Sequence, residues 1–122
     1  ASADDIQVGD VYYCNQDTAF LATTAPSAEI VEYETTTFKF VVNDGNITFG
    51  KEGTLSGEVF EIDQPYYLAL RNGHYTNLIF AKKLNNNNLM LSSQENGSLK
   101  LMLAVFGIEG QIMGITASCD KF

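Results

Sequence analysis

The chain has 122 residues, 45% of them hydrophobic and 11% aromatic, and 15 acidic against 7 basic side chains give a formal net charge of −8. This length and composition suit a single globular domain, residues 1–122, with a sizeable core. The negative charge excludes nucleic acid and anionic membrane surfaces as partners, because both would repel the protein. No apolar run reaches the roughly 18 residues that a membrane-spanning helix needs, so we expect no membrane insertion.

The chain begins with ASADD, which is small in its side chains and then acidic. Such a start is typical of a chain from which a signal peptide has been removed. We therefore expect a secreted or periplasmic protein whose residues 1–9 form a flexible segment ahead of the fold.

The first strand-like stretches are DVYYCN and TAFLAT, which we predict as two short strands with a turn near Gln16-Asp17. The next stretch, AEIVEYETTTFKFVV, is long for one strand and should bend near its threonines. Within it, the period of two places Phe38 and Phe40 on one face. Asp44-Gly45 then predicts a hairpin turn into ITFG, because glycine adopts a positive φ without steric cost.

The second half of the chain has the same character. GEVFEI predicts a strand, and Asn72-Gly73 and Asn96-Gly97 each separate two alternating runs, as in tight hairpins. The last run, QIMGITASC, places Met113 and Cys119 on one strand face. No segment combines an apolar period of 3.6 residues with a helix cap.

These elements predict an all-β fold, an antiparallel meander of eight to ten strands. A meander of hairpins closes when its first strand pairs with its last. We therefore expect a closed or nearly closed barrel, with a β-sandwich as the alternative.

The two cysteines, Cys14 and Cys119, lie in the first and the last predicted strand. Their spacing fits neither a zinc site nor a redox motif, and neither has a histidine nearby in sequence to act as a base. We predict that they form a disulfide that joins the two ends of the barrel. A disulfide persists in oxidising compartments, in agreement with export.

The sequence shows no recognisable set of catalytic or metal-binding groups. His74 is the only histidine, and no serine lies in a nucleophile motif. No acidic loop has calcium-binding spacing, and no glycine-rich loop has phosphate-binding spacing. We therefore expect a non-enzymatic protein without metal or cofactor.

Apolar side chains are the main functional lead, because an eight-stranded barrel either fills with side chains or holds one small ligand. Our first hypothesis is a binding protein for a small apolar molecule inside the barrel, although a filled core is the ordinary outcome. The candidate lining residues are Phe38, Phe40, Phe49, Leu68, Leu70, Phe80, Leu101 and Leu103.

The alternative hypothesis comes from a resemblance. Tyr12, Tyr13 and Cys14 match a Tyr-x-Cys opening, and Gly73, Tyr75, Lys82 and Lys83 partly match a Ser-Gly-x-x-Tyr segment followed by Lys-Gly. In these features the chain resembles the bacterial inhibitors of C-type lysozyme, which are small periplasmic β-barrels. It also resembles calycin-type binding barrels, by architecture alone.

The resemblance to the inhibitors implies a protein-interaction module that binds a basic partner through the 72–84 hairpin. The implied contact residues are Asn72, Gly73, Tyr75, Lys82 and Lys83. Asn72 stands where the family has serine, Leu84 stands where it has glycine, and the spacing to Tyr75 is one residue short.

Overall fold

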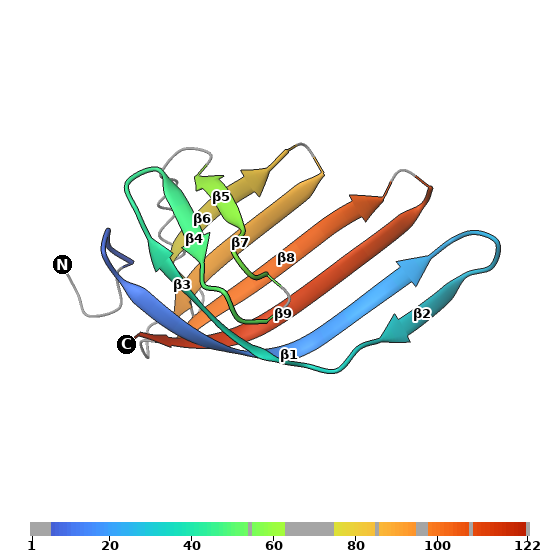
Figure 1. The fold of residues 1–122 in the computed structure, drawn as a ribbon, viewed down its shortest axis with the longest axis horizontal. Helices are drawn as coiled ribbons and strands as arrows, with labels where there is room; N and C mark the ends of the chain where they lie inside the picture. The colour runs from blue at the N-terminus through green and yellow to red at the C-terminus, as the bar shows by residue number, and fades with distance from the viewer. Residues whose placement is uncertain are drawn as a thin grey trace.

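The structure is a computed structural model that describes residues 6–53, 55–62, 75–84, 86–94, 98–107 and 109–121. These residues form nine strands in one antiparallel sheet (Figure 1). The strands are β1 (Val11–Thr23), β2 (Glu29–Glu32), β3 (Thr37–Val42), β4 (Asn46–Phe49), β5 (Val59–Ile62), β6 (Tyr75–Lys83), β7 (Asn87–Gln94), β8 (Leu99–Gly107) and β9 (Gln111–Lys121). Within the described ranges there is no helix that is long and apolar enough to cross a membrane.

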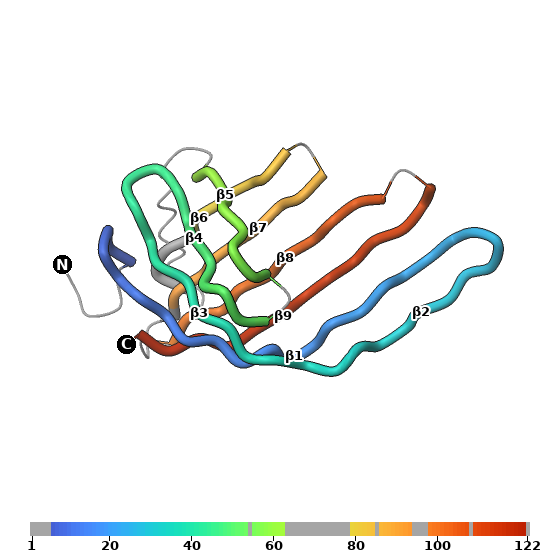
Figure 2. Tube along the Cα trace, viewed as in Figure 1, coloured from blue at the N-terminus to red at the C-terminus, as the bar shows by residue number. Residues whose placement is uncertain are grey.

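The sheet closes on itself. Its strand order is β2-β1-β3-β4-β5-β6-β7-β8-β9, and β1 also pairs with β9. Eight strands thus form a closed barrel, to which β2 is added as an extra strand. The predicted closed meander is confirmed, and the sandwich alternative is wrong. Figure 2 shows that the β1–β2 and β8–β9 hairpins reach beyond the shorter strands β3, β4 and β5.

The region predicted as two short strands at the start is one continuous strand, β1. A β-bulge between Gln16 and Thr18 takes the place of the predicted turn. A bulge adds one residue to a strand without ending it. The first part of β1 pairs with β3 and the last part pairs with β2. The long run from 28 to 42 therefore breaks into two strands at 33–36, close to the threonines.

The predicted turn at Asp44-Gly45 is confirmed. It joins β3 to β4, and Gly45 has a φ of 91°. The loop between β4 and β5 likewise has positive φ at Gly53 and Gly57. The turns predicted at Asn72-Gly73 and Asn96-Gly97 lie outside the described residues, as does His74.

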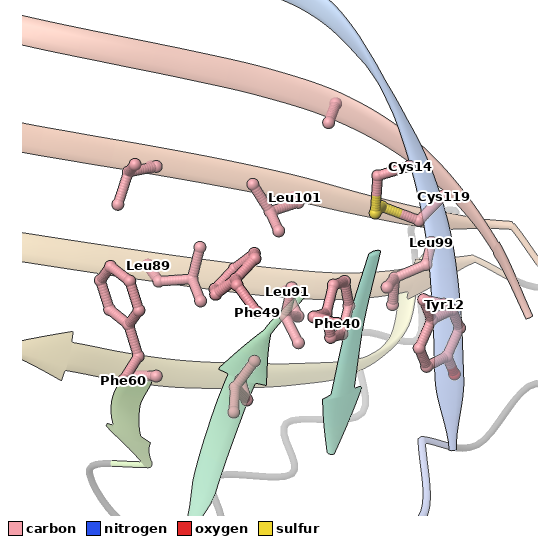
Figure 3. Packing of buried hydrophobic residues seen from close by; sticks show 14 of the residues in the cluster. Tyr12, Cys14, Phe40, Phe49, Phe60, Leu89, Leu91, Leu99, Leu101 and Cys119 are labelled. Carbon is pink, nitrogen blue, oxygen red and sulfur yellow. A yellow bond between two sulfur atoms is a disulfide. The ribbon is translucent and has the colours of Figure 1, made fainter. Parts of the chain in front are cut away.

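The core is formed by inward side chains from all eight barrel strands (Figure 3). Tyr12, Phe40, Phe49 and Phe60 form a chain of aromatic contacts, with ring centroids 5.2, 5.5 and 5.7 Å apart. Ile6 belongs to the same core, at 2% exposure. Ile6 therefore contributes to the core, while Val8, two residues on, is 67% exposed.

The predicted disulfide is present. Cys14 on β1 and Cys119 on β9 are direct register partners, and their sulfurs are bonded across a sequence separation of 105 residues. Both cysteines are buried. The bond therefore fixes the seam at which the first and last strands close the barrel (Figure 3).

Candidate functional site

The residues predicted to line a ligand cavity form a packed core instead. Phe38, Phe40, Phe49, Leu101 and Leu103 all point inward, as expected, but each is at most 3% exposed. A cavity that could hold a ligand would leave accessible surface on its lining. Aromatic rings and leucines fill the space between these described strands.

Phe80 was expected among these lining residues, and this prediction is wrong. Its neighbours Ile79 and Ala81 are buried in the core, so the period of two turns Phe80 to the outer face of β6. There it is 40% exposed. The two remaining candidates, Leu68 and Leu70, lie outside the described residues.

The predicted partner contacts that the structure describes lie at the two ends of β6. Tyr75 begins β6, whereas Lys82 and Lys83 end it. At a rise of about 3.3 Å per residue, these positions are roughly 23 Å apart. Lys83 forms an ion pair with Glu58, while Asn72 and Gly73 lie outside the described residues.

The strand registers instead reveal aligned rows of side chains on the outer face. One row crosses five strands from β6 to β1, with Phe80, Met90, Met102, Thr116 and Thr18 in register. The next row consists of Lys82, Asn88, Ala104, Gly114, Phe20 and Glu32. A third row consists of Phe106, Ile112, Ala22 and Ile30. Large apolar side chains therefore gather on the solvent side of this part of the sheet.

We define the outer apolar face by six residues that point away from the core: Phe20, Phe80, Met90, Met102, Phe106 and Ile112. Met102, Phe106 and Ile112 are 49, 46 and 43% exposed. A shallow groove of about 340 Å³ lies over the same strands, and Phe80, Met90, Met102 and Ile112 contribute to its lining. The groove is on the convex side of the barrel, separate from the filled interior.

A glycine determines the shape of this groove. The ring of Phe20 lies directly over Gly114, which is its register partner on β9. A Cβ atom at position 114 would lie 2.4 Å from the ring, so only glycine lets the ring rest against the neighbouring strand. An aromatic ring that covers a strand glycine restores the packing that glycine lacks. Phe20 therefore adds to the apolar floor.

A polar network borders the outer apolar face. Lys100 Nζ donates a hydrogen bond to Ser118 Oγ at 2.7 Å, and Ser118 Oγ donates to Asp17 Oδ2 at 2.6 Å. Ser118 on β9 thus bridges the ammonium of Lys100 on β8 and the carboxylate of Asp17 on β1.

Within the described ranges, no three histidine, cysteine or acidic side chains come together as a ligand set. Comparisons with known protein families, curated protein sequences and solved structures find no match.

Sequence reasoning assigned the apolar side chains to the interior and missed the outer apolar face. A signal was present in the run LKLMLAVF, where apolar residues occupy both sets of alternating positions and therefore both faces of the strand. Leu101 and Leu103 fill the core, whereas Met102 and Phe106 project outward. An antiparallel strand with one solvated face alternates apolar and polar residues, so a break in that alternation marks a second contact surface.

Proposed function

We propose that the protein is a non-enzymatic recognition module that binds the apolar surface of a partner through its outer apolar face. The observation that carries this proposal is the set of large apolar side chains, each at least 40% exposed, in the first and third rows of one face: Phe80, Met102, Phe106 and Ile112. Phe20 lies in the row between them. At ordinary strand spacing and rise, the rows cover roughly 500 Å². This area includes polar side chains such as Lys82 and Asn88, so its apolar part is smaller. Apolar patches of about 300–600 Å² are often functional.

The site of recognition in this proposal is the outside of the barrel, not its interior. The inward side chains of the described strands are buried in the core, whereas the groove of about 340 Å³ is open to solvent, and this contrast supports a site on the outside. A convex apolar surface suits contact with another macromolecular surface better than enclosure of a small molecule. The proposal therefore replaces the ligand-carrying barrel with a surface-binding one.

We also propose that the protein works in an oxidising compartment, as a secreted or periplasmic protein. The Cys14–Cys119 disulfide supports this, because cytosolic thiols are usually kept reduced.

The proposal is tested with Nile red, an uncharged dye that fluoresces strongly when it binds apolar surface. The native protein should enhance the dye emission, and Met102→Lys should remove most of this enhancement by placing a charge in the centre of the face. Val59→Lys is the matched control, since Val59 is 44% exposed on β5, outside the face. This control should retain the signal of the unmodified protein.

Circular dichroism of each variant would verify that the fold is intact. The proposal is overturned if the native protein leaves the dye emission unchanged. It is also overturned if Met102→Lys and Val59→Lys reduce the emission equally, because the dye would then bind elsewhere.

A further inference from the structure

We infer that the partner of the outer apolar face is a polypeptide segment that carries lysine or arginine beside its apolar side chains. The positively charged side chain enters a hollow between β1 and β2, next to the face. This inference rests on the proposed function and names the chemistry of the partner for the same surface. It places the charged contact on β1 and β2, away from the contact residues on β6 that the resemblance implied.

The hollow has a volume of about 460 Å³ and combines aromatic with acidic side chains. Phe20 and Tyr33 contribute the aromatic rings, and Asp17 and Glu32 contribute the carboxylates. None of the described residues that line it is basic. An ammonium or guanidinium group is attracted both by carboxylates and by the faces of aromatic rings. This lining therefore favours the end of a lysine or arginine side chain.

Phe20 connects the hollow to the outer apolar face. Its ring lies over Gly114 and borders both the hollow and the groove of about 340 Å³. Glu32 is the register partner of Phe20, and register partners on neighbouring strands project from the same side of a sheet. A segment that lies along the groove can therefore place one of its side chains in the hollow, between the ring and the carboxylate.

The charged side chains in this part of the chain are all negative. From 15 to 38 the sequence has no lysine, arginine or histidine, and its acidic residues are Asp17, Glu29, Glu32 and Glu34. These residues include the β1–β2 hairpin, which reaches beyond β3, β4 and β5 (Figure 2). The net charge of −8 acts in the same direction, because it attracts a basic partner and repels an acidic one.

Two lysines at the borders of the face have partners within the chain. Lys100 donates to Ser118, which in turn donates to Asp17, so this carboxylate is held in place and its charge is partly balanced. Lys82 lies opposite Glu61 in register. Glu32 is exposed, and among the described residues no ion pair involves it. Its carboxylate is therefore available to a basic side chain of the partner.

Fluorescence anisotropy with two labelled synthetic peptides tests this inference on the whole chain. One peptide is composed of leucine and lysine, and in the other glutamate replaces every lysine, so that both have the same apolar content. The native protein should bind the lysine peptide at least about tenfold more tightly than the glutamate peptide. The measurement is made at about 0.1 M salt, where charges more than about 10 Å away are largely screened.

Charge-neutralising variants separate contact in the hollow from general attraction. The double variant with Asp17→Asn and Glu32→Gln should bind the lysine peptide about three- to tenfold more weakly. The asparagine keeps an oxygen that can accept the hydrogen bond from Ser118. The matched control has Asp44→Asn and Glu52→Gln, which change the net charge equally at exposed positions outside the hollow. This control should bind within about twofold of the native protein, because its charges are screened from the hollow.

The Nile red experiment distinguishes failure of this inference from failure of the proposed function. A native protein that binds the dye but binds neither peptide, or binds both equally, would overturn the basic partner and leave the recognition face standing. A protein that binds neither the dye nor a peptide would overturn both. If the two double variants, each with its fold verified by circular dichroism, bind the lysine peptide equally, the hollow is not the site of the charged contact and the inference is wrong.

Discussion

The phenol of Tyr12 illustrates how burial changes the chemistry of one residue. Its ring is buried and stacks on Phe40. Burial, and then the negative charge of Asp10, raise the pKa of this phenol well above its ordinary value of 10.0. The folded protein therefore holds the phenol proton more tightly than the unfolded chain does.

This difference predicts how stability depends on alkaline pH. Below the unfolded pKa of about 10, Tyr12 is protonated in both the folded and the unfolded state, so stability does not depend on pH through this group. Above that pKa only the unfolded chain loses the proton. Stability therefore falls as the pH rises. Tyr12→Phe should remove this loss, which amounts to about 1.4 kcal/mol for each pH unit. Urea unfolding of both proteins at neutral and alkaline pH measures it. Parallel pH profiles for Tyr12→Phe and the native protein would contradict the prediction.

At the scale of single elements, Gln16 connects β1 to the segment between β2 and β3. Its backbone N–H donates to Thr36 O at 3.0 Å, and its side-chain Oε1 accepts from Thr36 N at 3.1 Å. The side-chain Nε2 is buried and has no hydrogen-bond partner. Gln16 thus combines one useful contact with one costly unpaired donor.

Gln16→Leu should separate these two effects. The variant loses the acceptor for Thr36 N but also removes the unpaired donor, so the free energy of unfolding should change by less than about 1 kcal/mol. Locally, hydrogen exchange of the Thr36 amide should accelerate by about tenfold or more. Asn15→Ala, on the opposite face of β1, should leave this exchange rate unchanged. Unaltered exchange at Thr36 in Gln16→Leu would show that the side chain does not hold the segment.

The same elements show what the sequence could predict. Asp44-Gly45 identified the β3–β4 turn because the positive φ at Gly45 is a local requirement. Gln16-Asp17 resembled a turn, but long-range pairing with β9 keeps β1 continuous and turns the extra residue into a bulge. That outcome depends on strand partners far along the chain, which local propensity does not contain.

At the scale of the whole molecule, the closure of the barrel was predictable from Cys14 and Cys119, because they lie in the first and last strands. The outer apolar face was not found, because the side chains on it come from strands whose register is fixed only by the complete sheet. Phe80 illustrates the difference, since the sequence shows that it alternates with Ile79 and Ala81 but not which of the two faces is buried.

Removal of the disulfide should weaken the barrel without opening it. The loop that it closes is long, and the chain-entropy model gives a contribution of up to about 4.7 kcal/mol for such a loop. Because β1 and β9 remain paired along most of their length, the variant with both Cys14→Ala and Cys119→Ala should fold, with its free energy of unfolding lowered by about 2–4 kcal/mol. Thermal and urea unfolding measure the change, with the reduced native protein as the control. Unchanged stability, or two reactive thiols in the denatured, unreduced protein, would contradict this prediction.

The location of the recognition surface can be read from the methionines. The chain has three, of which Met90 and Met102 lie on the outer apolar face and Met113 lies on the inner side of β9. Methyl resonances of these residues, recorded by NMR at low protein concentration while Nile red is added, report contact at each position separately. We predict that the signals of Met90 and Met102 shift and that the signal of Met113 stays in place. A shift at Met113 with no change at Met90 and Met102 would place binding inside the barrel and contradict the account.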